Sequence, residues 1–155
     1  LLSAGLGDSI NFVNASLAAK ARGIQVHEVK DESSRDFAGG SLQITTRGDQ
    51  GNRSVTGAVF ADGDLRITSI DAFPVNVTPS SHMLFTRHRD MPGIIGHLGS
   101  LLGEHNVNIA AMQVGRKIVR GDAVMMLSID DPIPAELLQT ITGIDGIQEA
   151  HPVTL

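Results

Sequence analysis

The 155-residue sequence contains no cysteine, no tryptophan and no tyrosine. Without cysteine the chain cannot form disulfides, zinc–thiolate sites or a thiol nucleophile, which fits a reducing compartment. Its net charge of −5 argues against electrostatic binding of nucleic acid. No apolar run approaches the roughly 20 residues needed to span a bilayer, and no signal peptide is visible. With five phenylalanines and 41% hydrophobic residues, the core must be mainly aliphatic.

The first half of the sequence predicts one helix followed by about four strands. Apolar residues recur every three or four positions between Asp8 and Gly23, which predicts a helix. Alternating or β-rich segments separated by the turn formers GDQGN and ADGD predict an antiparallel sheet. These segments are IQVHEV (24–29), SLQITTRG (41–48), RSVTGAVF (53–60) and LRITSI (65–70), with VNVTPSS (75–81) as a crossing strand that runs into a linker.

The second half predicts the order βαββαβ, the split-βαβ or ferredoxin-like arrangement. Its strands are expected at residues 82–88, 107–116, 123–130 and 147–155, and its helices at 93–105 and 134–142. We therefore expect an α+β protein of two small domains, residues 1–77 and 82–155. In the second domain the helices should cover one face of the sheet and leave the other free for a partner.

Three glycines form a stripe along the helix predicted at 93–105. Gly96, Gly99 and Gly103 follow one another at spacings of three and four. Each interior glycine costs about 1 kcal/mol relative to alanine, so another backbone should approach closely there. We favour packing within the chain's own fold, and the alternative is a contact between subunits.

The start of the same helix predicts a site for a small zwitterion. Pro92 can begin a helix, and the free N–H groups of the first turn attract a carboxylate. Asp90 precedes it and can either cap the helix or bind a cation. Asn108 opens the next strand, and we expect it near the same end of the sheet as Asp90. Together these groups suit a free amino acid.

Other sequence patterns do not predict a functional site. The six histidines show neither H-x-H nor H-E-x-x-H spacing, so we expect surface histidines and no metal site. No G-x-G-x-x-G follows a strand, so the chain should lack a nucleotide-binding fold. Arg116, Lys117 and Arg120 share one hairpin, for which we expect a solvated turn rather than a contact.

Long segments resemble a known family. RHRDMPGIIGHLGSLLGEHNVNIAAMQVGR (87–116) resembles the start of an ACT domain, an amino-acid-sensing module of metabolic enzymes. GDSINFVNASLAAKARGI (7–24) and ITSIDAFPVNV (67–77) resemble the intervening domain of the long form of D-3-phosphoglycerate dehydrogenase, which commits carbon to serine. The chain also begins without an initiator methionine, so we expect it to be part of a longer protein.

The resemblance implies that ACT domains pair into a homo-oligomer and bind L-serine in their interface for feedback inhibition. It places the ligand at His88, Asp90, Pro92, Gly93, Ile94 and Asn108. It further implies catalytic domains on the same polypeptide that use NAD, whereas the fragment itself would hold no cofactor and would not be an enzyme. A cytoplasmic location is expected, or the plastid stroma for a plant or algal source, with no nucleic-acid or membrane partner.

The intervening domain of some relatives binds an anion through basic side chains. Arg66 matches one such position, whereas Phe73, Pro74 and Thr78 stand where those relatives carry basic or imidazole groups. Because a phosphate site needs several cationic donors, we favour a structural role for this domain. The alternative to the whole interpretation is an autonomous ACT module that binds another amino acid or a protein.

Overall fold

The computed structural model describes residues 13–24, 40–48 and 51–155. The chain divides into two compact units, residues 1–34 and 35–155. In the first unit, helix α2 spans Ala15–Ala21, within the predicted helix. The start of that prediction, residues 8–12, and nearly all of the strand predicted at 24–29 lie outside the described residues. None of the described helices is long and apolar enough to cross a bilayer.

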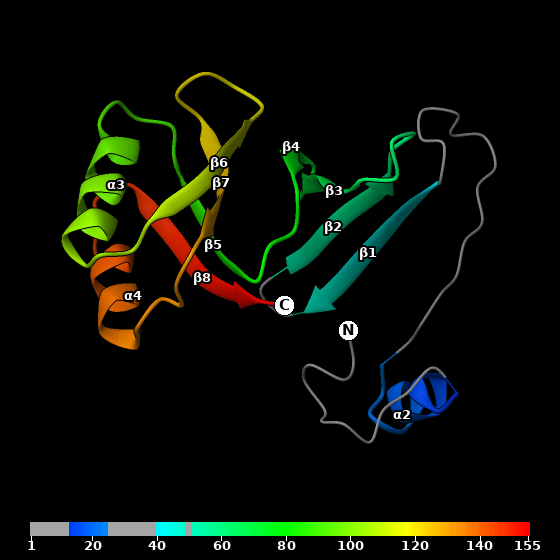
Figure 1. The fold of residues 1–155 in the computed structure, drawn as a ribbon. Helices are drawn as coiled ribbons and strands as arrows, with labels where there is room; N and C mark the ends of the chain where they lie inside the picture. Colours follow the sequence, from blue (N-terminus) through cyan, green and yellow to red (C-terminus); the bar gives the residue numbers. More distant parts are fainter. Residues whose placement is uncertain (1–12, 25–39, 49–50) are drawn as a thin grey trace. The chain divides into compact units, whose positions relative to one another are not determined.

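The second unit begins with an antiparallel sheet of four strands in sequence order (Figure 1). Its strands are β1 (Ser41–Gly48), β2 (Gly51–Val59), β3 (Leu65–Ile70) and β4 (Phe73–Val77). The strands predicted at 41–48, 53–60 and 65–70 are thereby confirmed, whereas the segment 75–81, expected as a crossing strand, contributes only its first residues to β4, the hairpin partner of β3. Asp71 and Ala72 alone connect β3 to β4, with φ of +49° and +60°. A two-residue hairpin turn of this hand matches the twist of the strands.

A second sheet follows, with strands β5 (His82–Arg89), β6 (Ile109–Arg116), β7 (Asp122–Ile129) and β8 (Ile147–Thr154). Helix α3 (Ile94–Glu104) joins β5 to β6, and α4 (Ala135–Thr142) joins β7 to β8. The spatial order is β6-β7-β5-β8 with every neighbouring pair antiparallel. This is the ferredoxin-like arrangement, so the predicted α+β class and βαββαβ order are confirmed.

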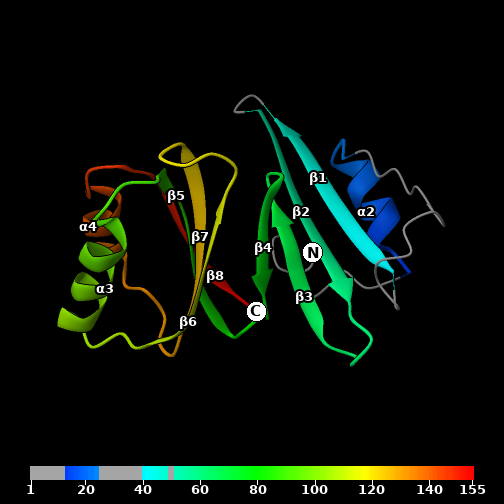
Figure 2. The ribbon, with the colours of Figure 1, turned by 90° about the horizontal axis from the view of Figure 1, so that it is seen from above.

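Both helices lie on one face of this sheet (Figure 2). Alternation along β5 and β7 points one set of side chains at the helices, where an aliphatic core forms. Leu84, Leu98 and Leu102 are each 0% exposed within it. Because this core is contributed by all the elements of the second half, it fixes where the loop between β5 and α3 emerges.

The opposite face of the second sheet is not free, contrary to our expectation for a partner surface. Met83 and Met126 on that face pack against Ile70 and Val77 of the first sheet. Strand β4 also approaches β6 so closely that a Cβ added at Gly115 would overlap the Pro74 carbonyl oxygen and lie 2.9 Å from Val75 Cγ1. The chain therefore covers this face with its own first sheet, and glycine at position 115 permits the approach.

Four charged side chains join the two sheets, and we term them the inter-sheet charge cluster: Arg53, Asp71, Arg87 and Glu149. Arg53 donates from Nη1 to Asp71 Oδ2 at 2.9 Å and from Nη2 to Glu149 Oε1 at 2.6 Å. Arg87 of β5 also donates to Asp71. Arg53 and Asp71 belong to the first sheet and its turn, whereas Arg87 and Glu149 belong to the second. Ion pairs between these alternating charges thus link one sheet to the other.

The cluster predicts loss of stability in acid. Burial raises the pKa of Asp71, but the Ser54 N–H and the neighbouring arginines bring it below the ordinary 3.8. Burial likewise raises the pKa of Glu149, and the hydrogen bond from Arg53 brings it below 4.5. Carboxyl pKa values depressed by folding stabilise the protein above the unfolded values, and this stabilisation is lost as pH falls through the folded ones.

We therefore expect the free energy of unfolding to decline as pH falls below about 4.5. Urea unfolding between pH 3 and 7 measures it. Asp71→Asn removes one of the titrating groups, so its acid decline should be shallower than that of the wild type. An identical decline in both proteins would show that Asp71 does not contribute.

Candidate ligand site

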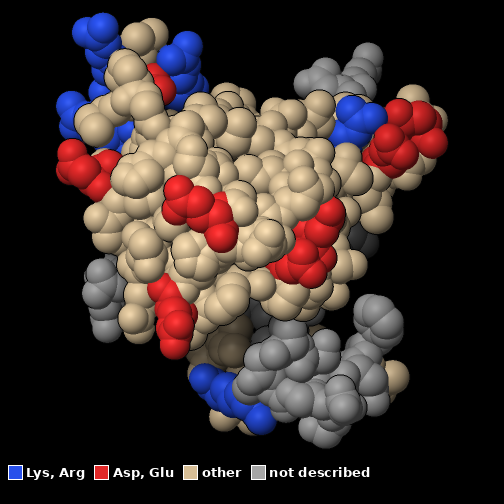
Figure 3. Space-filling view, turned by 60° about the vertical axis from the view of Figure 1, so that its left-hand side comes forward, with Lys and Arg blue, Asp and Glu red and all other residues tan. Residues whose placement is uncertain are grey.

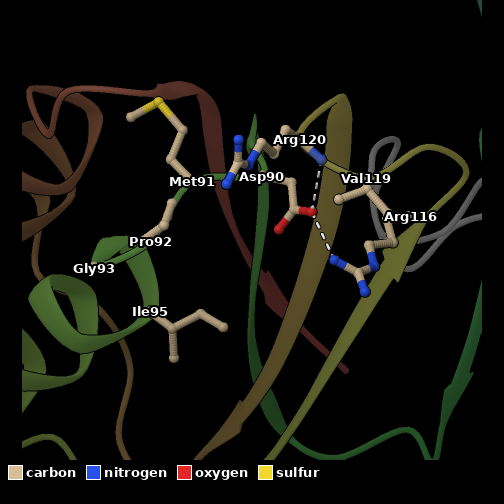
Figure 4. Close-up of a pocket in the computed structure, with 8 residues that line it drawn as sticks. All are labelled: Asp90, Met91, Pro92, Gly93, Ile95, Arg116, Val119 and Arg120. Atoms are coloured by element: carbon tan, nitrogen blue, oxygen red, sulfur yellow. Dashed lines mark hydrogen bonds and ion pairs between the residues drawn. The ribbon is translucent and has the colours of Figure 1, made fainter.

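A cavity of about 340 Å³ opens where β5 meets α3 (Figure 4). One wall is the loop between β5 and the first turn of α3, and the other is the hairpin between β6 and β7. The lining residues are Asp90, Met91, Pro92, Gly93, Ile95, Arg116, Val119 and Arg120. Three of the six residues predicted for the ligand site therefore line this cavity.

The loop owes its path to two local features. Gly93 takes a φ of +92° at the N-cap of α3, a conformation that side chains with a Cβ seldom adopt. The backbone N–H of Asp90 donates to the Gly121 carbonyl at 2.8 Å, which ties the loop to the hairpin. Because Gly93 caps the helix without a side-chain hydrogen bond, the alternative that Asp90 caps α3 is wrong.

The Asp90 carboxylate turns instead toward the hairpin. Its Oδ2 accepts from Arg116 Nη1 at 2.8 Å and from the Arg120 backbone N–H at 3.1 Å. The hydrogen bond from Arg116 lowers the pKa of Asp90, and the Arg120 N–H lowers it further. Asp90 is therefore a carboxylate at neutral pH, with its second oxygen facing the cavity (Figure 4).

His88 and Ile94 are buried and do not line the cavity. His88 is 1% exposed, and burial lowers the pKa of its imidazole although Asp90 opposes that shift. Its Nδ1 lies 3.4 Å from Thr86 Oγ1. Ile94 belongs to the core under α3. His88 is thus a neutral, buried imidazole two residues before Asp90.

Asn108 is far from Asp90 within one chain, so the expected convergence at one end of the sheet is wrong for a single chain. Asn108 directly precedes Ile109, which pairs with Ile129, and Ile129 pairs in turn with His82 at the start of β5. Asp90 follows the other end of β5, about 26 Å away along the strand at the usual rise of roughly 3.3 Å per residue. Asn108 Nδ2 instead donates to Asp130 Oδ2 at 2.8 Å.

Arg66, the candidate for an anion site, lies among carboxylates. Its Nη2 is 3.2 Å from Asp62 Oδ2 and 3.0 Å from Asp64 Oδ2. The guanidinium also sits 4.7 Å from the centre of the Phe60 ring. Two acidic neighbours already compensate this charge, so the surroundings of Arg66 do not favour an added anion.

Sequence reasoning missed the contribution of the β6–β7 hairpin. A solvated turn was expected, yet Arg116 bonds to Asp90, and Lys117 Nζ lies 3.3 Å from the Asp71 carbonyl oxygen and 4.5 Å from the Phe73 ring centre. The run GRKIVRGD signals several cations on one turn, but nothing local to it indicates which carboxylate they meet. Only the register of β6 on β7 brings Arg116 to Asp90.

The glycine stripe has no packing partner within the described part of the chain. A Cβ added at Gly96, Gly99 or Gly103 would meet no atom within 4 Å. The favoured explanation, packing inside the chain's own fold, is therefore wrong. The cost of three glycines in one helix is not offset by any contact that the described residues make.

The surface around α3 and α4 is mainly uncharged. Figure 3 brings this side forward and shows separated Asp and Glu side chains, with Lys and Arg gathered at the margins. The described part of this face thus has no continuous basic patch of the kind that nucleic acid requires. In addition, no three histidine or carboxylate side chains gather as metal ligands among residues 13–24, 40–48 and 51–155.

The second sheet and its two helices define a ferredoxin-like domain with a cavity at the start of its first helix. Residues 82–146 match the family model of the ACT domain, and residues 1–71 match that of the D-3-phosphoglycerate dehydrogenase intervening domain. The chain thus comprises an intervening domain of the D-3-phosphoglycerate dehydrogenase type followed by an ACT domain.

Full-length relatives agree with these matches. The chain is 58% identical over 155 residues to the D-3-phosphoglycerate dehydrogenase of Synechocystis, and 36% identical over 155 residues to that of Methanocaldococcus jannaschii. All of this chain is covered in both cases, but it spans only 28% and 29% of the two relatives. It is also 24% identical over 129 residues to a probable L-serine dehydratase β chain of Bacillus subtilis, covering 83% of this chain and 58% of the relative.

Proposed function

We propose that the chain is the regulatory and oligomerisation part of a D-3-phosphoglycerate dehydrogenase. In this proposal residues 1–77 form the intervening domain, residues 82–155 form the ACT domain, and L-serine binds between paired ACT domains as a feedback inhibitor. The similarity of the whole chain to dehydrogenases of that name carries the proposal. A relative named for L-serine dehydration supports L-serine as the ligand.

Within a single chain, the cavity offers partners for the ammonium and carboxylate groups of an amino acid. The free oxygen of Asp90 can accept the ammonium group, and the N–H groups at the start of α3 can receive the carboxylate. Ile95 and Val119 contribute aliphatic side chains to the lining of the cavity.

A second copy of the chain would bring Asn108 to the same cavity. Strand β6 is an edge of the described sheet, with β7 as its one neighbour. Two copies paired antiparallel along β6 about a two-fold axis at Met112 would place Asn108 of the partner subunit opposite Arg116. Asn108 is therefore remote from Asp90 in one chain and close to it in the dimer.

The same side of the molecule offers an interface. Met112 on β6 is 37% exposed and Ile95 on α3 is 44% exposed. The glycine stripe beside them leaves the α3 backbone open to close approach by a copy of itself. The side-by-side dimer thus gives the stripe a contact that the single chain lacks.

In the parent protein the reaction would occur outside these residues, on catalytic domains of the same polypeptide with NAD as cofactor. L-serine can inhibit only if it binds one arrangement of the subunits more tightly than another. The location proposed for the parent is the cytoplasm, or the plastid stroma in a plant or alga.

Calorimetric titration of L-serine into the chain tests the site. Asp90→Ala and Asn108→Ala should each weaken binding at least about tenfold, because each removes a charge-assisted or buried hydrogen bond. Asp64→Ala, a similar surface substitution remote from the cavity, is the matched control. Unchanged affinity in the two site variants would reject the assignment.

Mixing the two variants tests whether the site is shared. If each site takes Asp90 from one chain and Asn108 from the other, a mixed dimer keeps one intact site. Co-refolding equal amounts should therefore restore about a quarter of the wild-type sites by random pairing. No restoration would place both residues in the same chain's site and contradict the shared cavity.

A further inference from the structure

We propose that Arg116 is a ligand-binding residue of the ACT site and recognises the carboxylate of the bound amino acid. This inference rests on the proposed function and deepens it. The sequence resemblance assigns the ligand to the loop, the helix start and Asn108, whereas the cavity adds a cation from the β6–β7 hairpin.

The geometry leaves Arg116 free to bind. Its Nη1 is committed to Asp90 Oδ2, but a guanidinium has five N–H donors in a planar fork. The remaining donors of Arg116 have no hydrogen-bond partner among the described residues. Its side chain is 53% exposed at the cavity wall, so a ligand can reach it without displacing protein atoms.

Asp90 and Arg116 together complement both charges of an amino acid. Asp90 Oδ2 holds the hairpin through Arg116 and the Arg120 N–H, which leaves Oδ1 for an ammonium group. Arg116, one hydrogen bond away, can then donate to the carboxylate attached to the same carbon. An α-amino acid placed against the pair meets an opposite charge at each end, and Figure 4 shows the two side chains hydrogen-bonded to each other beside the cavity.

The charge of the lining favours the carboxylate end. Its charged side chains are Asp90, Arg116 and Arg120, so the lining carries one net positive charge beside the positive end of α3. A ligand that lacks the carboxylate would leave this positive charge uncompensated. Hydrogen bonds between a guanidinium and a carboxylate are also stronger than those from a neutral backbone N–H.

Comparing two ligands distinguishes direct binding of the ligand carboxylate by Arg116 from a role of Arg116 in positioning Asp90 alone. L-serine and L-serinamide share the ammonium and hydroxymethyl groups, but the amide lacks the negative charge. Both are titrated by calorimetry into the 155-residue wild type and into Arg116→Gln and Arg116→Lys, and circular dichroism checks the fold of each variant. Lys117→Gln, which removes the adjacent cation that faces Asp71 and Phe73, is the matched control.

The wild type should prefer L-serine over L-serinamide at least tenfold. Arg116→Gln should lose at least tenfold in affinity for L-serine while binding L-serinamide within about twofold of the wild type. Arg116→Lys should retain part of the preference for L-serine over L-serinamide. Lys117→Gln should retain all of this preference. Equal losses for both ligands in Arg116→Gln would mean that Arg116 only positions Asp90, and would overturn the inference. A wild type that binds neither ligand would overturn the proposed function as well.

Discussion

Gly99→Leu is expected to weaken self-association of the chain roughly 100-fold, equivalent to about 2.7 kcal/mol. The reason is steric: in the proposed dimer the α3 backbones approach along the glycine stripe, and a leucine there holds them apart. The separated protomer should not suffer, because a Cβ at position 99 meets no atom within 4 Å. Replacing an interior helix glycine should instead stabilise it by up to about 1 kcal/mol.

The two effects have opposite signs, which makes the experiment decisive. Analytical ultracentrifugation across a concentration series measures self-association, and thermal unfolding of the dilute protein measures protomer stability. His97→Leu, a change at an exposed position on another side of α3, is the control and should leave the dimer intact. Self-association at wild-type strength in Gly99→Leu would exclude the glycine stripe from the interface.

Asp71→Ala is expected to destabilise the second compact unit by about 2–3 kcal/mol, because it leaves Arg53 and Arg87 with Glu149 as their one shared carboxylate and removes the acceptor of the Ser54 N–H. The Asp71 side chain is 11% exposed, and its Oδ1 also accepts the Ser54 N–H at 2.8 Å. Alanine would in addition have to adopt the φ of +49°, which disfavours residues other than glycine, asparagine and aspartate. Differential scanning calorimetry should show the Tm falling by roughly 5–10 °C.

Asp71→Asn separates charge from backbone conformation. Asparagine tolerates the turn and retains an acceptor for the Ser54 N–H. The variant should therefore lose only the part of the unfolding free energy that comes from the ion pairs with the arginines. Asp62→Ala, which breaks a pair between Arg66 and a carboxylate that is 56% exposed, should cost at most about 1 kcal/mol. An Asp71→Ala protein as stable as Asp62→Ala would show that the inter-sheet charge cluster does not stabilise the folded unit.

The ligand cavity and the charge cluster are connected through one hairpin. Arg116 reaches Asp90 at the cavity, and the next residue, Lys117, reaches the Asp71 carbonyl oxygen on the first sheet. A displacement of Arg116 therefore acts on the hairpin that Lys117 anchors to the first sheet. Measuring the Tm of Asp71→Ala with and without L-serine would report whether the two places are energetically linked.

Much of the fold was predictable because its signals are local. The period of α3, the alternation of the strands and the turn formers between them depend only on neighbouring residues. The same holds for the loop from Asp90 to Gly93, whose members are contiguous and necessarily stay together. The order βαββαβ then restricts the second half to very few arrangements.

The sequence could not predict contacts between residues that are distant along the chain. Helix α3 runs back toward the end of the sheet where β5 began, so β6 starts there and Asn108 lies remote from Asp90. Arg116 lies 26 residues from Asp90 and meets it only because β6, β7 and β5 pair in one register. Likewise, packing alone decided that the first sheet covers the open face of the second and that the glycine stripe stays uncovered, because no local pattern encodes which surface is buried by which.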